Sequence, residues 1–454
     1  GIYNPGVLVL ENSIIAQNSS VKNSGADFVN SGPSFSLKTR GINLVQDTTG
    51  SFGLLGPKDI TNQAPMLTPL GYYGGPTMTM HPLAGSPVID PEGGASEAGA
   101  ELDQRGFARL LDGDSPADGR ATLDLGAVEA GRVLLVTTSS DEDDAAPGRG
   151  TGTSLREAVA AGLTGGDRIL IDSAVSGKLR LSREIEVDGR NLFLDASDRA
   201  GGLELSGMFA TRAITIRKGA SLALYHLKIH SCKADGDGGA IRNEGRTSIT
   251  RALITDNEGT HGGAISSQGP LTLTSSVLKR NAARAGGGAL HQSGGELRLT
   301  NVSLLQNRAQ QLGGALVGEG DDLVVINHSH FSSNAASSGG AIANSGPMEL
   351  SSTTLDRNTA RETGGALLNQ GSLSLANSTL TGNNAEDAGA IDNHGPLSLV
   401  HATICGNTAA NFAGGVSLSR STTSLQHSIV AGNQALLGPD LFLAGRSGGD
   451  NLLS

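Results

Sequence analysis

A repeat of 24 to 26 residues constrains this chain more than any other feature of its sequence. The tetrapeptide Gly-Gly-Ala-Ile/Leu, or a close variant of it, recurs at that spacing. Its copies begin at Gly238, Gly262, Gly287, Gly313, Gly339, Gly364, Ala388 and Gly414. Self-similarity at a fixed period of about 20 to 50 residues is typical of solenoids. We therefore predict that this stretch is built from stacked, equivalent coils.

A second mark keeps the same period. In each repeat an apolar residue precedes an asparagine by three positions, as Leu278 precedes Asn281. The predicted structural column of asparagines consists of Asn257, Asn281, Asn307, Asn334, Asn358, Asn383, Asn407 and Asn433. Asparagine tolerates left-handed turns and hydrogen-bonds nearby backbone, and stacked asparagines hydrogen-bond to one another. We expect the column to occupy one corner of each coil and to bond coil to coil.

Between these marks apolar and polar residues alternate, as in Leu373-Ser-Leu375. Alternation favours strands, and Gly and Asn every few residues leave no room for a helix. We predict an all-β fold, a parallel β-helix with about 25 residues and three short strands per coil. Each strand would pair in parallel with its equivalent in the next coil. Two interior columns are expected, one of Leu271, Met348, Leu373 and Leu397 and one of Leu278, Leu355, Leu380 and Ile404.

The Gly pair of each repeat is expected to need either a positive φ or a close backbone approach.

The beginning of the chain resembles its end. Ser13-Ile-Ile-Ala-Gln-Asn18 matches Ser428-Ile-Val-Ala-Gly-Asn433, 415 positions later. Gly41-Ile-Asn-Leu44 echoes Gly449-Asp-Asn-Leu452 after 408 positions. Two interpretations stay open: the chain is a window of a longer tandem array, or it is a processed filament subunit with equivalent ends.

Composition divides the chain into four predicted parts. Seven prolines between Pro57 and Pro91 forbid continuous strand ladders there and indicate an irregular cap and linker. The run from Thr153 to Ala160 is typical of a short helix capped by Thr or Ser. The parts are residues 1–75, the terminal coil and cap of a preceding β-helix; 76–130, a linker; 131–200, an opening cap; and 201–454, the parallel β-helix.

Several motifs resemble modules of secreted bacterial β-helix proteins. The series Gly74-Gly-Pro-Thr77, Leu83-Ala-Gly-Ser-Pro-Val-Ile-Asp90, Asp103-Gln-Arg-Gly106 and Asp124-Leu-Gly-Ala-Val-Glu129 resembles the choice-of-anchor tail module. Thr153-Ser-Leu-Arg-Glu-Ala158 resembles the CSLREA opening module, with Thr153 in place of its cysteine.

The repeats themselves are similar to those of polymorphic outer-membrane proteins and related surface β-helices. These resemblances imply a right-handed coil and an extracellular or cell-surface location. A tail module followed by an opening module further implies a junction between tandem copies.

Composition argues against several partners. A net charge of −11 disfavours nucleic acid and anionic membrane surfaces, and no apolar run approaches the about 20 residues of a membrane-inserted span. Nine Phe, four Tyr and no Trp leave little material for an aromatic sugar platform. Cys232 and Cys405 fall about seven coils apart, roughly 34 Å at ~4.8 Å per coil, so they are expected to be free thiols.

Catalysis is not expected. β-Helices that resemble pectate lyases line a cleft between long loops with acids and bases, whereas these coils vary by two residues in length. Charged residues scatter over the coils, as expected of a solvated surface. They include Arg251, Lys279, Arg280, Arg284, Asp321, Asp322 and Arg361.

Two patterns raise the question of a metal ion. His401 and His427 lie on adjacent coils, ~5 Å apart, and either bind a transition metal or belong to a polar column that faces water. Asp112, Asp114 and Asp118 surround a glycine as carboxylates do in calcium loops, although the bidentate Glu of such loops is missing. The alternative there is a plain polar turn, and no other cofactor is expected.

The sequence favours a structural component of an extracellular or cell-surface fibre, built from tandem or end-to-end β-helices that self-associate through their open sheet edges. A surface adhesin that binds glycans or host or neighbouring cells is the alternative. A polysaccharide lyase or hydrolase is a third possibility.

Overall fold

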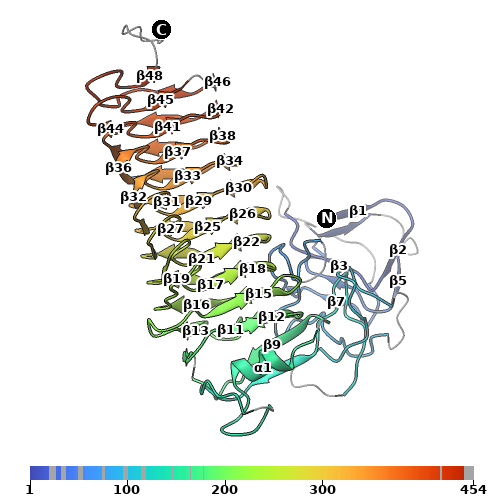
Figure 1. The fold of residues 1–454 in the computed structure, drawn as a ribbon. Helices are drawn as coiled ribbons and strands as arrows, with labels where there is room; N and C mark the ends of the chain where they lie inside the picture. The colour runs from blue at the N-terminus through green and yellow to red at the C-terminus, as the bar shows by residue number, and fades with distance from the viewer. Residues whose placement is uncertain are drawn as a thin grey trace.

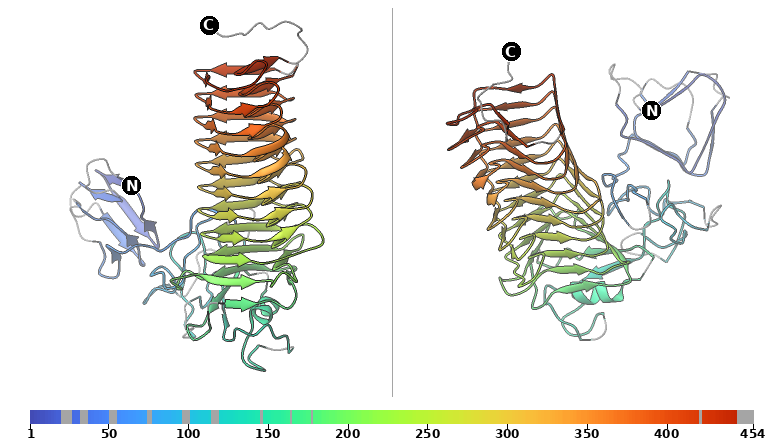
Figure 2. Two further views of the ribbon diagram at one scale, coloured as in Figure 1. Left: turned by 90° about the vertical axis from the view of Figure 1, so that its left-hand side faces the viewer. Right: turned by 45° about the horizontal axis from the view of Figure 1, so that its top comes forward.

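The computed structural model is a right-handed parallel β-helix whose coils stack into a rod (Figure 1). It describes residues 1–19, 27–31, 37–49, 55–73, 77–95, 101–113, 119–144, 147–163, 165–176, 178–419 and 422–443. The described residues up to 130 lie beside the rod, as both views of Figure 2 show.

Three long parallel sheets run the length of the rod. The first, 11-stranded, contains β11 (Ile185–Val187), β14 (Ile214–Ile216), β17 (Ile241–Asn243), β21 (Ile265–Ser267), β25 (Leu290–Gln292), β29 (Leu316–Gly318), β33 (Ile342–Asn344), β37 (Leu367–Asn369), β41 (Ile391–Asn393), β45 (Val416–Leu418) and β48 (Leu441–Leu443). The second, 12-stranded, contains β8 (Val133–Val136), β9 (Asp167–Ile171), β12 (Asn191–Asp195), β15 (Ser221–Tyr225), β18 (Arg246–Thr250), β22 (Leu271–Thr274), β26 (Leu297–Thr300), β30 (Val324–Asn327), β34 (Pro347–Ser351), β38 (Ser372–Ala376), β42 (Leu397–Val400) and β46 (Thr423–Gln426). The third, 11-stranded, contains β10 (Lys178–Arg180), β13 (Leu203–Ser206), β16 (Leu227–His230), β19 (Leu253–Thr255), β23 (Val277–Lys279), β27 (Ser303–Leu305), β31 (His330–Ser332), β35 (Thr354–Asp356), β39 (Thr379–Thr381), β43 (Thr403–Cys405) and β47 (Ile429–Val430).

A fourth sheet corrects the prediction of three strands per coil. Seven coils add a short strand after the asparagine corner, where residues were expected to form a turn. These strands are β20 (Glu258–Gly259), β24 (Ala282–Ala283), β28 (Arg308–Ala309), β32 (Ala335–Ser338), β36 (Thr359–Thr363), β40 (Asn384–Ala385) and β44 (Thr408–Ala409). Most contain two residues, too few to show an alternation in the sequence.

The predicted interior columns are confirmed. Leu271, Met348, Leu373 and Leu397 occupy one register of the second sheet, and Leu278, Leu355, Leu380 and Ile404 one register of the third. All eight are at most 3% exposed and belong to one continuous apolar core.

The asparagine column forms a buried hydrogen-bonded ladder. Nδ2 of Asn281, for example, donates to Oδ1 of Asn307 in the next coil (3.0 Å) and to the carbonyl of Ile254 in the preceding one (3.0 Å). The backbone N–H of Asn281 also donates to that Oδ1. The expected coil-to-coil bonding is confirmed, but the left-handed backbone lies one residue earlier, as at Arg280 (φ 54°). That turn sends the asparagine side chain inward.

The six Gly pairs that begin at Gly238, Gly262, Gly287, Gly313, Gly339 and Gly364 meet both expected requirements. In the last two repeats the positive φ belongs to Ala388 and Ala413, so Gly414 is the second, closely packed residue of its repeat. Gly262 has a φ of +63°, and a Cβ on Gly263 would lie 2.3 Å from the carbonyl oxygen of Gly288 and 2.4 Å from that of Ala282. The fourth sheet therefore packs directly on the second glycine of the pair, where no side chain fits.

The first coils are capped by helix α1 (Leu155–Ala161), which contacts β8 and β11. Ser154 is its N-cap: its Oγ accepts from the N–H of Glu157, and the Glu157 carboxylate accepts from the N–H of Ser154. This reciprocal pair satisfies two N–H groups that a helix start would otherwise leave free.

The described residues between Ile2 and Thr61 form a small solenoid of their own. Its three parallel sheets pair β1 (Ile2–Asn4) with β4 (Phe28–Asn30), β2 (Leu8–Glu11) with β5 (Leu37–Arg40), and β3 (Ile14–Ile15) with β6 (Leu44–Val45) and β7 (Ile60–Thr61).

The proline-containing segment after β7, from here on called the linker and consisting of the described residues of 62–130, packs on the outer face of the second sheet. Tyr73 and Leu83 cluster with Phe193 and Tyr225, and the N–H of Ala84 donates to Asp195 (2.9 Å). This cover explains why β9 and β15 are buried at every position, whereas the later strand β38 alternates between exposed and buried residues.

Candidate functional site

Three asparagines each donate both the backbone N–H and Nδ2 to one aspartate oxygen: Asn433 at the end of the ladder, Asn18 near the start of the chain, and Asn43, which donates to Oδ1 of Asp59 (2.8 and 2.9 Å). Oδ1 of Asp440 accepts both the N–H and Nδ2 of Asn433, each at 2.9 Å. Oδ1 of Asp27 accepts the same two groups of Asn18, also at 2.9 Å. An ionised carboxylate accepts the N–H and Nδ2 donors of an asparagine but has no N–H group of its own that needs an acceptor in a further coil. An aspartate can therefore end a series of stacked asparagines.

The strands around these two ends correspond one to one. β1, β2, β3 and β4 contain 3, 4, 2 and 3 residues, as do β45, β46, β47 and β48. β4 pairs with β1 as β48 pairs with β45. The sequence match of residues 13–18 with 428–433 is therefore accompanied by a match of strand lengths, strand pairing and the two Asn-to-Asp hydrogen bonds.

The last described coil leaves part of its interior uncovered. Leu425 pairs in register with Leu399, which is 0% exposed, yet Leu425 is 41% exposed. Within the described residues, Ile429, Leu436 and Leu437 are also exposed at this end of the rod.

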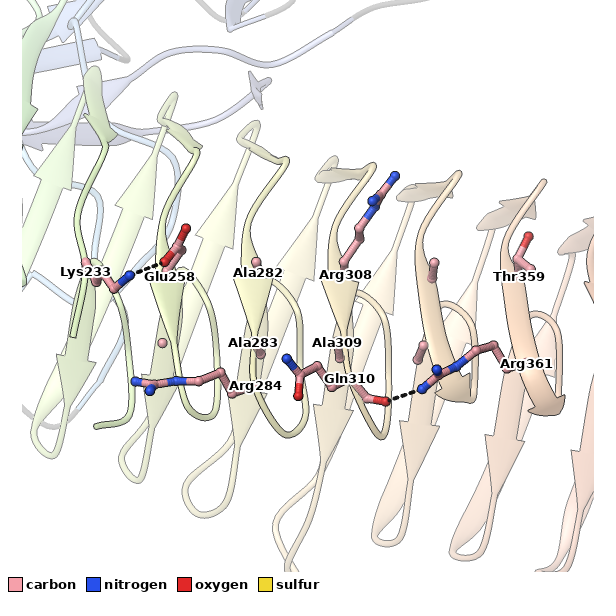
Figure 3. A pocket seen from close by; sticks show the side chains of 13 residues that line it. Lys233, Glu258, Ala282, Ala283, Arg284, Arg308, Ala309, Gln310, Thr359 and Arg361 are labelled. Carbon is pink, nitrogen blue, oxygen red and sulfur yellow. Dashed lines mark hydrogen bonds and ion pairs between the residues drawn. The ribbon is translucent and has the colours of Figure 1, made fainter. Parts of the chain in front are cut away.

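A groove of ≈ 610 Å³ runs over the fourth sheet, parallel to the rod axis (Figure 3). Its floor contains Gly259, Ala283, Ala309 and Ala336, one small residue from each of four coils. These residues stand two positions after the ladder asparagines. The residues one and three positions after each asparagine form the two rims.

Cations occupy both rims of the groove. Arg308 lies on one rim, and Arg284 and Arg361 lie on the other. Each of the latter two reaches back over two coils: Nη2 of Arg361 donates to the carbonyl of Gln310 (3.1 Å), and Nη2 of Arg284 to the carbonyl of Asp235 (3.2 Å). Lys233 is also part of the lining, but it is paired with Glu258 (2.8 Å).

This grouping corrects the expectation that the charges of the coils scatter without a shared position. Arg284 and Arg361 both stand three residues after a ladder asparagine, so the stacking brings them into one column. Arg308 was missed. A small residue two positions after the asparagine of every repeat from Asn257 onward was the signal that could have located the groove.

The linker holds a network of buried charges. The Arg105 guanidinium binds Asp103 (2.8 Å), and both side chains are at most 1% exposed. Its Nη1 also donates to the carbonyl of Tyr73 (3.1 Å). Asp124 accepts the N–H of Ala130 (2.6 Å). Burial, and then the neighbouring Glu129, raise the pKa of Asp124 well above its ordinary value.

A serine, a histidine and an aspartate meet on the third sheet. His330 Nε2 lies 2.5 Å from Oδ1 of Asp356, and Ser332 Oγ donates to Oδ2 of the same carboxylate (3.2 Å). Burial raises the pKa of Asp356, but hydrogen bonds from His330 and Arg357 outweigh it, and the pKa lies below its ordinary value. A serine nucleophile needs a histidine base, and this serine is bound to the carboxylate instead.

His401 and His427 stack face to face, with ring centroids 5.1 Å apart and an interplanar angle of 12°. Both are exposed and have a left-handed backbone, at the corner between the second and third sheets. The predicted proximity is therefore present, as a stack of nearly parallel rings.

The calcium hypothesis falls largely outside the described residues. Asp114 and Asp118 are not among them, and Asp112 accepts the N–H of Gly119 (2.8 Å). In the described part of the chain, no three His, Cys, Asp or Glu side chains form a group able to hold a metal ion.

Both cysteines are free, as predicted. Burial raises the pKa of the Cys232 thiol to about 12.

No known family model matches the chain, and no curated protein matches its sequence. The helix of the described residues is too short to cross a membrane.

Proposed function

We propose that this chain is a structural component of an extracellular or cell-surface fibre, in which β-helices follow one another in tandem or end to end. One observation carries the proposal: a coil near the start of the chain and the last described coil share their strands and their Asn-to-Asp termination. A duplicated coil is what a repeating array contains where one unit ends and the next begins.

The mechanical properties of the fold support this role. The strands pair coil to coil along the rod axis, and a buried ladder reinforces one corner. Such a rod resists unfolding because each coil is supported by its neighbours. The uncovered interior at Leu425 provides a surface for self-association, since open sheet edges pair readily with other strands.

The location rests on resemblance. Residues 76–130 resemble a choice-of-anchor tail module, residues 131–200 a CSLREA opening module, and the coils the repeats of polymorphic outer-membrane proteins. All three belong to secreted or surface β-helices. We propose a mechanical rather than a catalytic role, because the Ser332, His330 and Asp356 cluster lacks a serine–histidine contact.

Electron microscopy of the purified chain tests the proposal. We expect filaments with a repeat of one rod plus linker. Leu425→Lys should leave isolated rods, because it places a charge where the next coil must cover the interior. Leu312→Lys, which changes a partly exposed leucine at mid-rod, is the matched control and should still form filaments.

Isolated rods from the unmodified chain, or filaments from Leu425→Lys, would contradict end-to-end assembly. An ultraviolet-absorbing product from acidic polysaccharides would favour a lyase instead.

A further inference from the structure

A fibre needs no groove on its side, yet the fourth sheet forms one. The groove follows the rod axis over the coils that contain β20, β24, β28, β32 and β36. Its small, mainly apolar floor is flanked by side chains that extend outward and along the axis (Figure 3). A site of this shape fits an extended ligand better than a compact one.

The cations of the groove are poorly neutralised by their surroundings. Among the described residues, no side chain forms an ion pair with Arg308 or Arg361. Arg361 donates to the hydroxyl of Ser337 (2.8 Å) and to a carbonyl. Arg284 lies 3.3 Å from Asp235, whose side chain is 98% exposed. This local positive charge stands out in a chain whose net charge is −11.

The spacing of the cations fits a repeating anion. Arg284 and Arg361 are three coils apart, about 14 Å at ~4.8 Å per coil. Arg308 stands between them along the axis, on the opposite rim. A linear polymer in the groove would present charged groups alternately to the two rims. Guanidinium groups bind carboxylate and sulfate-like groups with paired, charge-assisted hydrogen bonds.

The floor favours a sugar chain over a peptide. Strand β24 is paired on one side with β20 and on the other with β28, so its backbone offers no free ladder to an extended peptide. Glycine and alanine provide no pockets for peptide side chains. The lining contains no aromatic ring on which a neutral sugar could stack. Recognition must then depend on charge.

We propose that this groove binds a linear anionic polysaccharide, whose carboxylate or sulfate groups are held by Arg284, Arg308 and Arg361. Uronate chains and sulfated chains share this chemistry. The proposal is independent of end-to-end assembly, because the groove lies on the side of the rod and away from both ends of the described chain.

Titration calorimetry with the full chain tests this site. The probes are an oligogalacturonate, a heparin-derived oligosaccharide, neutral dextran and hexaglutamate peptide. We expect binding of at least one of the two anionic sugars, with an affinity that falls as salt is added. Arg308→Gln should weaken it about tenfold or more, because a charged hydrogen bond is lost. Ala335→Phe should also weaken it, since it fills the groove without changing any charge.

Arg357→Gln is the matched control. Arg357 is exposed and lies on the same coil as Arg361, but outside the groove, and it should bind like the unmodified chain. Circular dichroism establishes that each variant keeps the fold. Equal binding of dextran, stronger binding of hexaglutamate, absence of binding to both anionic sugars, or an unchanged affinity in Arg308→Gln would each overturn the proposal.

Discussion

The rod and the linker that packs on it are stabilised in different ways. In the rod, neutral groups repeat: Asn334 is bonded to Asn307 below and Asn358 above, and Leu355 has a leucine or phenylalanine on either side. In the linker, buried charges are paired in contacts that do not repeat, such as the ion pair of Arg105 with Asp103. The same hydrogen bonds and apolar contacts recur in coil after coil of the rod, whereas each contact of the linker occurs once.

This difference determines how far the loss of stability caused by one substitution extends along the chain. If one coil loses a ladder hydrogen bond, the neighbouring coils should stay folded, because the stability of a solenoid is approximately a sum of local terms. The linker has no second copy of its central ion pair, so losing it should loosen the part of the linker around that pair. Three substitutions test this comparison.

Arg105→Met should have the largest effect. It leaves the buried Asp103 carboxylate without its partner, which costs about 3–5 kcal/mol. Hydrogen exchange followed by mass spectrometry should show faster exchange across residues 101–113 and 122–130, with the rod beyond residue 280 unchanged.

The control for this change is Arg280→Met in the rod, which removes a half-exposed pair with Asp256. Exposed pairs contribute less than about 1 kcal/mol, so exchange should change little. Equal effects of the two substitutions would show that the linker is not held by its buried charges.

Asn334→Ala should have the next largest effect. It removes the acceptor of Asn307 Nδ2 and the donors to Leu304 and Asn358, and leaves buried groups unsatisfied. We expect a local loss of about 3 kcal/mol, visible as faster exchange in the coils between residues 300 and 360. Asn384→Ala, at an exposed position, should change stability by less than about 0.5 kcal/mol. Unfolding of the entire rod by Asn334→Ala would contradict additive coils.

His81→Phe should have the smallest effect at neutral pH and a distinct pH signature. Burial, and then the nearby Arg105, lower the pKa of His81 well below its ordinary value. Below about pH 6.5 the unfolded linker therefore binds a proton that the folded linker does not, and stability falls by at most about 1.4 kcal/mol per pH unit.

Phenylalanine would keep the contacts with Tyr73 and Phe193 and remove this titration. The difference in linker stability between the variant and the unmodified chain should grow from pH 7 to pH 5. Taking that difference isolates His81 from Asp124, whose raised pKa acts in the opposite direction as the pH falls. A difference that is constant with pH would show that His81 is not buried in the neutral form.

The sequence predicted the rod well because its signals are local and repeated. The Gly-Gly-Ala tetrapeptide and the ladder asparagines identified the coil length, the strand pairing and the interior columns. The fourth sheet was not predicted, because most of its strands contain two residues and are too short to show an alternation of apolar and polar residues. Arg284 and Arg361 could be named from the sequence, but their grouping with Arg308 depends on which position of the coil faces the groove.

The sequence by itself determined the parallel β-helix and the similarity of its first and last described coils, because a period fixes which residues stack. Only the tertiary structure decided where the asparagine side chains point, since a left-handed residue such as Arg280 turns them inward. It also decided which side of the rod the linker covers, because Tyr73 and Phe193 meet across 120 positions that no periodic signal connects.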